Sequence, residues 1–179
     1  LQPEIILKME GICKSFPGVR ALDNVDFTLR RGEIHALMGE NGAGKSTLIK
    51  ILNGVYEKDA GRIVLEGRPV HFRSPQDAQK LGIGTVFQEI ALCPNLTVAE
   101  NMFIGRGWKA LVNWKEMNKR AAEMLNSLGI PAGPTQELAN CSIAVQQMIA
   151  IARAVDMDCK ILILDEPTSS LDEDETQKL

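Results

Sequence analysis

Cysteine and histidine are scarce in this sequence. Its 179 residues include only 4 cysteines and 2 histidines. The two cysteines nearest to each other along the chain, Cys141 and Cys159, are 18 residues apart, so no C-x-x-C pair exists. Because this pattern indicates neither a zinc site nor a disulfide framework, we expect all four cysteines to be reduced thiols.

Long apolar runs and an excess of basic charge are also missing. The apolar run at residues 161–164 is far shorter than the roughly 20 residues that cross a bilayer. The formal net charge is -3, so there is no basic surplus to neutralise nucleic-acid phosphates. Since 45% of the residues are hydrophobic and 24% are charged, the sequence suits a globular domain. We expect no membrane span, no nucleic-acid partner and a cytosolic location.

The spacing of apolar residues predicts strands that alternate with helices. Strands are predicted at residues 25–29, 34–38, 62–66, 84–87 and 160–165, the second and last of them buried. Helices are predicted after Gly44, after Ser74-Pro75, over residues 114–128 and over residues 142–156. This order favours an α/β fold with a mostly parallel sheet, whose core is residues 1–88 and 158–179. Residues 89–157 are predicted to form an inserted helical subdomain.

A glycine-rich motif typical of phosphate binding begins at Gly39. Residues 39–46 fit G-x-x-x-x-G-K-[ST] between a predicted strand and a predicted helix. Glycines let backbone N–H groups turn around phosphate oxygens, and the helix N-terminus adds partial positive charge. Lys45 would contact the β and γ phosphates and Ser46 would bind Mg²⁺, whereas a turn with a solvated lysine is the alternative. The predicted nucleotide-binding residues of this loop are Gly39, Glu40, Asn41, Gly42, Ala43, Gly44, Lys45, Ser46 and Thr47.

Two adjacent carboxylates follow the last predicted strand. Asp165 would be a ligand of Mg²⁺, and Glu166 would be the general base that polarises the attacking water. Acids at the end of a strand are usually only solvated, so this interpretation depends on the glycine-rich motif.

Four segments of the sequence resemble the nucleotide-binding subunit of ABC transporters. They are GENGAGKST at residues 39–47, VFQE at 86–89, SIAVQQ at 142–147 and ILILDEPT at 161–168. FPGVRAL at residues 16–22 and QQM at 146–148 are similar to the amino-terminal half of the tandem ATPases of bacterial monosaccharide importers, of the ribose, galactose and galactofuranose kind. The resemblance implies a P-loop NTPase fold, with ATP and Mg²⁺ as cofactors.

The same resemblance implies roles for three more residues. Phe16 would stack on adenine, although the sequence alone, without the resemblance, favours a core residue at this position. Gln88 would contact Mg²⁺ and the attacking water and couple the site to the permease, the alternative being a polar residue at a strand end. Asp172 would contact the opposite subunit, and residues 172–175 can also be the acidic first turn of a helix.

The segment that faces the opposite subunit departs from the family pattern. Most relatives have L-S-G-G-Q, whereas this chain has Cys-Ser-Ile-Ala-Val at residues 141–145 and keeps only Ser142. The resemblance implies that Ser142, Ala144 and Gln146 face the γ-phosphate held by the other subunit. Ala144 is harmless there if its backbone is helical but costs stability if φ is positive.

The resemblance also implies a histidine on a strand after Asp172, followed by further sheet. Neither His35 nor His71 can be that histidine, and we expect both to be structural. We therefore expect the 179 residues alone to hydrolyse little ATP.

Taken with the resemblance, the motifs predict an ATPase subunit that powers import of a monosaccharide. It would be peripheral, on the cytoplasmic face of the inner membrane, with permease subunits, a solute-binding protein and a second ATPase domain as partners. One alternative is a soluble ABC-type ATPase of translation or DNA repair, which the net charge disfavours. Another is a nucleotide-binding regulatory module without catalysis.

Overall fold

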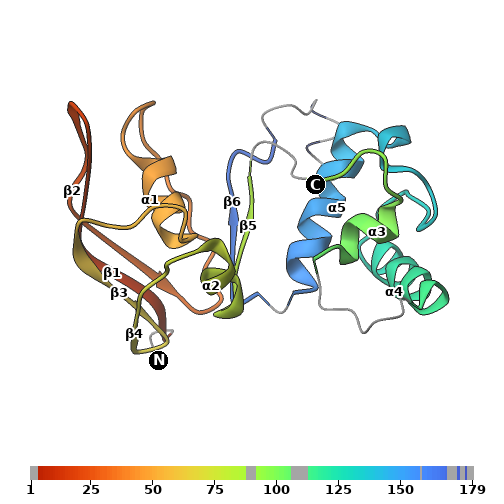
Figure 1. Ribbon diagram of the computed structural model, residues 1–179, viewed down its shortest axis with the longest axis horizontal. Coiled ribbons are helices and arrows are strands. Elements are labelled where there is room, and N and C mark those ends of the chain that lie inside the picture. Colours follow the sequence, from red (N-terminus) through yellow and green to blue (C-terminus); the bar gives the residue numbers. More distant parts are fainter. Residues whose placement is uncertain are drawn as a thin grey trace. The chain divides into compact units, whose positions relative to one another are not determined.

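The computed structural model describes residues 4–87, 92–105, 113–157, 159–168, 173 and 176. The chain forms two compact units, Leu1–Ile83 and Gly84–Leu179. Figure 1 shows the helices and strands of each unit.

The first unit contains a four-stranded sheet in the order β2-β1-β3-β4. Its strands are β1 (Ile5–Phe16), β2 (Val19–Arg30), β3 (Ala60–Leu65) and β4 (Arg68–Val70). Every pairing between them is antiparallel, so the expectation of a mostly parallel sheet is wrong for these strands. The reason is local, because two-residue turns join β1 to β2 and β3 to β4, and such short turns force neighbouring strands to run in opposite directions.

The helices of the first unit follow the sequence pattern. Helix α1 (Lys45–Leu52) buries Leu48, Ile51 and Leu52, as its apolar spacing predicts. Helix α2 (Pro75–Lys80) has proline in its first turn, and the Ser74 hydroxyl accepts a hydrogen bond from the backbone of Asp77. Both predicted helices are therefore confirmed.

The strand and the burial predicted at residues 34–38 are wrong. The structure assigns no strand there, and Ile34 and Met38 are 101% and 87% exposed. An apolar segment becomes a buried strand only when other strands pair with it, and the described sheet of this unit does not include it. His35 is consequently not in a buried strand: its ring packs on Phe27 and its Nδ1 lies 3.0 Å from Oε1 of Glu33.

Two short strands of the second unit pair with each other. They are β5 (Ile83–Val86) and β6 (Ile161–Leu164). Ile161 is buried, but Leu162 and Leu164 are 36% and 42% exposed, so the expected complete burial of β6 is wrong. Successive side chains of a strand point to opposite faces of the sheet, and the face of β6 that carries Leu162 and Leu164 is the exposed one.

Three helices surround the apolar core of the second unit (Figure 1). They are α3 (Val98–Phe103), α4 (Trp114–Ser127) and α5 (Ile143–Val155), and a short 3₁₀ helix, η1 (Leu138–Asn140), precedes α5. The predicted stripe of α4 buries Met117, Ala121 and Leu125, while Trp114 lies 54% exposed at its start. Among the described residues, no helix has the length and apolar character needed to cross a membrane.

Candidate functional site

The glycine-rich loop leads directly into helix α1. The loop backbone is exposed from Gly39 to Ala43, and a backbone hydrogen bond of 3.1 Å from Ala43 to Glu40 closes its turn. Gly44 is the N-cap of α1 and has no side chain to occupy the free N–H groups of the first helical turn. These N–H groups and the helix dipole make the loop an anion-binding surface.

Two glycines of this loop adopt backbone conformations that other residues rarely take. Gly42 has φ of 87° and Gly44 has φ of 89°. At both positions the left-handed backbone turns the chain back on itself, which lets consecutive N–H groups converge. The spacing of glycines in the sequence therefore matches the geometry that phosphate binding requires.

The Lys45 ammonium group lies over the same loop. Its Nζ donates hydrogen bonds to the carbonyl oxygens of Gly39 at 2.5 Å and Glu40 at 3.0 Å. A β-carbon at position 39 would lie 3.3 Å from Cβ of Ala43, which is a tight contact, but only in ordinary contact with the Lys45 side chain. A positive charge thus stands at the mouth of a loop whose N–H groups can bind anions.

Phe16 is at the end of β1, in the same unit as the glycine-rich loop. Its ring is half-buried and meets the Tyr56 ring edge to face, with centroids 5.3 Å apart. Lys14 lies above the Phe16 ring, with Nζ 5.6 Å from the centroid. The ring is thus partly exposed and has a cation and a second aromatic ring beside it.

Asp165 and Glu166 follow β6 in the second unit. The backbone N–H of Asp165 donates to the carbonyl of Val86 at 3.0 Å, which extends the pairing of β5 and β6 by one residue. The Asp165 side chain is half-buried and that of Glu166 is exposed. Asp165 is thereby fixed beside Val86, the last residue of β5, which precedes Gln88 by two positions in the sequence.

Glu166 has a left-handed backbone with φ of 48°. This conformation costs a residue other than glycine about 1 to 2 kcal/mol. The other such residues in the described part of the chain are Asn24 in β2 and Glu66 in the turn after β3. Unlike Glu66, Glu166 is not in a hairpin turn, and backbone strain of this kind gathers at functional sites.

Helix α5 begins at the segment that departs from the family pattern. The Ser142 hydroxyl caps the helix by accepting the backbone N–H of Val145 at 3.3 Å. Ala144 is buried in the first turn of the helix and its φ is not positive, so the expected cost does not arise. Gln146 donates through Nε2 to the carbonyl oxygens of Cys141 at 3.0 Å and Leu138 at 3.4 Å, which ties the helix to η1.

The predicted site residues belong to both compact units of the chain. Phe16 and the loop from Gly39 to Thr47 belong to the first unit, whereas Asp165, Glu166 and the start of α5 belong to the second. Gln88 and Asp172 lie outside the described residues. The sequence did not single out Lys14 and Tyr56, which contact the Phe16 ring, or Asp59, which contacts Lys14, because each is a single residue in no motif.

The donor groups proposed for Mg²⁺ fit that ion. Ser46 has an exposed hydroxyl in the first turn of α1, and Asp165 offers a carboxylate at a strand end. Both are hard oxygen ligands, and Mg²⁺ commonly takes only one or two protein oxygens together with substrate phosphates and water. Within the described ranges no three His, Cys, Asp or Glu side chains gather into a metal-binding group.

A family model described as "ABC transporter" matches residues 22–169 of the sequence. The chain therefore belongs to the ABC transporter family, and the fold class predicted from its motifs, a P-loop NTPase of the ABC ATPase type, is confirmed.

Curated relatives narrow the comparison to sugar importers. The chain is 56% identical to the galactofuranose transporter ATP-binding protein YtfR of Escherichia coli (strain K12), over 99% of this chain and 36% of that protein. It is 51% identical to the fructose import ATP-binding protein FruK of Bifidobacterium longum, over 97% of this chain and 34% of that protein. The chain thus spans about a third of the length of the curated relatives it matches.

Solved structures give the same fold. The ADP conformation of MJ1267, an ATP-binding cassette of an ABC transporter, superposes with a TM-score of 0.83 at 28% identity, over 97% of this chain and 73% of that one. For cbiO1 from Clostridium perfringens, part of the ABC transporter complex cbiONQ, the TM-score is 0.82 at 32% identity, over 98% of this chain and 70% of that one. Both come from ABC transporters, so the resemblance in sequence extends to the backbone.

Proposed function

We propose that this protein binds and hydrolyses ATP to power the import of a monosaccharide through a membrane permease. The observation that carries the proposal is the Lys45 ammonium group, which lies over an exposed glycine-rich loop at the start of α1. The names of the relatives, which are ATP-binding proteins for galactofuranose, ribose and fructose import, support the choice of transported substrate.

The loop residues would hold the triphosphate. When ATP enters, phosphate oxygens replace the carbonyl oxygens of Gly39 and Glu40 as partners of Lys45, and the N–H groups of residues 42–47 bind the β phosphate. Phe16 would stack on the adenine. Mg²⁺ would be held by Ser46, Asp165 and Gln88, and it supplies charge neutralisation to the phosphates.

Glu166 would act as the general base. It would accept the proton of a water molecule that attacks the γ-phosphorus in line with the leaving oxygen, while Gln88 orients that water. Lys45 would stabilise the charge that builds up on the phosphate oxygens in the transition state. The strained backbone of Glu166, with φ of 48°, supports this role, because strain of this kind gathers at functional sites.

A second ATPase domain would complete each site. Ser142, Ala144 and Gln146 at the start of α5 would face the γ-phosphate bound by the other domain, and Asp172 would contact that domain. In this proposal residues 1–88 and 158–179 form the ATP-binding core, and residues 89–157 form the helical subdomain. The protein would lie on the cytoplasmic face of the inner membrane, bound to permease subunits that receive sugar from a solute-binding protein.

The test compares two variants of the full-length protein that contains this chain. Lys45→Ala should abolish measurable ATP binding, and Glu166→Gln should keep binding while lowering turnover by about 10²- to 10⁴-fold, the usual contribution of a general base. Lys119→Ala and Glu123→Gln are matched controls, because these residues form an exposed ion pair on α4. Unchanged ATP binding by Lys45→Ala would refute the proposal for the loop, and unchanged turnover by Glu166→Gln would remove that residue from its role.

Transport is tested separately. Membrane vesicles that contain the complete assembly should take up a labelled monosaccharide only when ATP is present on the side of the ATPase. Galactofuranose, ribose and fructose are the first sugars to compare. Tight ATP binding without hydrolysis or uptake in the complete assembly would favour a regulatory module instead.

A further inference from the structure

Phe16 is surrounded by residues that restrict how its ring can lie. The Tyr56 ring meets it at an interplanar angle of 68°, and the Lys14 ammonium group is 5.6 Å from its centroid. Lys14 is itself largely shielded, with 17% of its side chain exposed. A surface aromatic ring without such neighbours would sample several rotamers and lose that freedom on binding.

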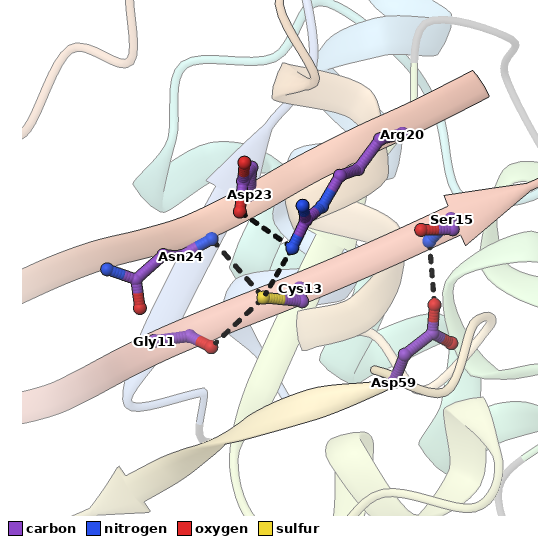
Figure 2. A network of polar contacts seen from close by, with 7 residues as sticks. All are labelled: Gly11, Cys13, Ser15, Arg20, Asp23, Asn24 and Asp59. Carbon is purple, nitrogen blue, oxygen red and sulfur yellow. Dashed lines mark hydrogen bonds and ion pairs between the residues drawn. The ribbon is translucent and has the colours of Figure 1, made fainter.

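One carboxylate fixes the end of β1 next to this ring. Asp59 receives a hydrogen bond of 2.8 Å from Lys14 Nζ through Oδ1 and one of 2.7 Å from the Ser15 backbone N–H through Oδ2. Its own backbone N–H donates to the Cys13 carbonyl at 2.9 Å. Figure 2 shows the Asp59 carboxylate directed at the Ser15 nitrogen, while Cys13 contacts Gly11, Arg20 and Asn24. Asp59 therefore holds three consecutive residues that precede Phe16.

We propose that Asp59 is a positioning residue for nucleotide binding, which acts by holding Lys14 and Ser15 so that the Phe16 ring is presented for stacking by the base. This inference rests on the proposed function, because it assumes that ATP binds at the glycine-rich loop. Asp59 touches neither phosphate nor base in this proposal. It lowers the cost of ordering the aromatic side chain that does.

The charges around Asp59 support this arrangement. The hydrogen bond from Lys14, followed by that from the Ser15 backbone, holds the pKa of the Asp59 carboxyl below its usual range, so it remains ionised and keeps both partners at neutral pH. Tyr56 is linked in turn to the phosphate-binding helix, because Lys50 of α1 places Nζ 5.5 Å from the Tyr56 ring centroid. Phe16 is thus connected through side chains to the helix that starts at the phosphate site.

The test separates recognition of the base from recognition of the phosphates. In the full-length protein, affinities for ATP and for inorganic triphosphate would be measured by calorimetry. Phe16→Ala should weaken ATP binding by about 5- to 150-fold, as expected for loss of one base–aromatic stack. Asp59→Ala should weaken it by about 2- to 10-fold, as expected when one aromatic side chain must be ordered on binding. Neither change should alter the affinity for triphosphate.

Two further variants make the result specific. Lys14→Met removes the cation while it leaves the backbone contacts of Asp59 intact. If Asp59→Ala unfolds the protein, the ATP affinity of Lys14→Met tests the inference instead. Asp23→Ala is the matched control, because Asp23 is an exposed carboxylate of β2 that pairs with Arg20, and it should bind ATP like the wild type. In a Phe16→Ala background, Asp59→Ala should have no additional effect on ATP affinity.

The possible failures are distinguishable. If Asp59→Ala weakens ATP and triphosphate equally, its role is structural and the inference is wrong. If Phe16→Ala weakens ATP binding but Asp59→Ala and Lys14→Met do not, the ring needs no positioning and the inference is again wrong. If the wild type binds neither ligand, or Lys45→Ala binds both as tightly as the wild type, the proposed function fails first.

Discussion

Gly44 packs so closely against the backbone of Ala21 that no other residue fits between the glycine-rich loop and β2. A β-carbon at position 44 would lie 2.6 Å from the Ala21 carbonyl oxygen and 2.7 Å from Cδ2 of Leu22. Gly44 also has φ of 89°. The start of helix α1 is therefore positioned by direct contact with the sheet.

We expect Gly44→Ala to lower the free energy of unfolding by about 2 to 5 kcal/mol. About 1 to 2 kcal/mol comes from the left-handed backbone, and the clash with a main-chain oxygen adds about 1 to 3 kcal/mol. Gly42→Ala is the matched control, because Gly42 has nearly the same φ but nothing within 4 Å of the added carbon. Urea denaturation should show a smaller loss for Gly42→Ala, about 1 to 2 kcal/mol, which is the cost of the left-handed backbone alone. Equal losses would mean that contact with β2 contributes nothing.

Asn101 is completely buried and holds the loop that precedes α3. Its Oδ1 accepts the Cys93 N–H at 2.7 Å, and its Nδ2 donates to the carbonyl oxygens of Cys93, Leu96 and Thr97. Asn101→Ala would take away the side-chain acceptor of the Cys93 N–H and one donor from each of the three carbonyl oxygens, which keep only their backbone donors. The substitution would also leave a cavity, so we expect a loss of about 2 to 4 kcal/mol in urea denaturation. Asn126→Ala, at an exposed position of α4, should stay within about 0.5 kcal/mol of the wild type. If Asn101→Ala lost as little stability as Asn126→Ala, water would have to replace the Asn101 amide.

Local signals in the sequence were sufficient for the phosphate-binding loop and most helices. The glycines of the loop set its backbone directly, and Ser74 and Ser142 cap the helices that follow them, because a cap depends on residues only three positions apart. Helix α3 could also have been predicted, since Thr97 and Glu100 form a complete capping box.

Long-range pairing was not accessible in the same way. Residues 34–38 are as apolar as a buried strand, but their burial depends on which strands pair with them. The apolar residues themselves do not indicate those partners. Strand β1 was missed because Gly11, with φ of 61°, and shifts of register interrupt its alternation. The contact of Asp59 with Ser15 joins residues 44 positions apart and has no motif.

Glu10 should make stability depend on acidity. Hydrogen bonds from Arg62 and then from Lys8 lower the pKa of Glu10 from 4.5 to about 2. Because the folded-state pKa is below the unfolded value, the carboxylate stabilises the fold above about pH 4.5, and this contribution is lost as the pH falls toward 2. The advantage of the wild type over Glu10→Gln in urea denaturation should therefore shrink across this range.

Arg62→Gln gives the partner control for that measurement. Removal of the guanidinium should raise the pKa of Glu10 toward its usual value. In an Arg62→Gln background, the free energies of unfolding with Glu10 and with Gln at position 10 should therefore differ less, and their difference should depend less on pH. A difference that stays constant from pH 4.5 to 2 would contradict the assignment of this pH dependence to Glu10. High salt should reduce the effect, because the pair lies at the surface.

Ser142 has two roles in our interpretation, and one substitution separates them. As the N-cap of α5 it accepts the Val145 N–H, and in the proposed function it faces the γ-phosphate of the other ATPase domain. Ser142→Asp keeps a good capping oxygen, so urea denaturation should show stability close to that of the wild type, whereas Ser142→Ala should lose about 1 kcal/mol.

The two roles predict opposite results for hydrolysis by Ser142→Asp. A carboxylate placed against the γ-phosphate repels it, so we expect ATP turnover in the full-length protein to fall at least about 10-fold although the protein remains folded. Asn113→Asp is the matched control, since Asn113 caps α4 by accepting the Glu116 N–H at 3.2 Å and has no place in the proposed site. If Ser142→Asp hydrolyses ATP as fast as Asn113→Asp, the serine is only a helix cap. Helix α5 would then recognise the γ-phosphate bound by the other domain through its N-terminus alone.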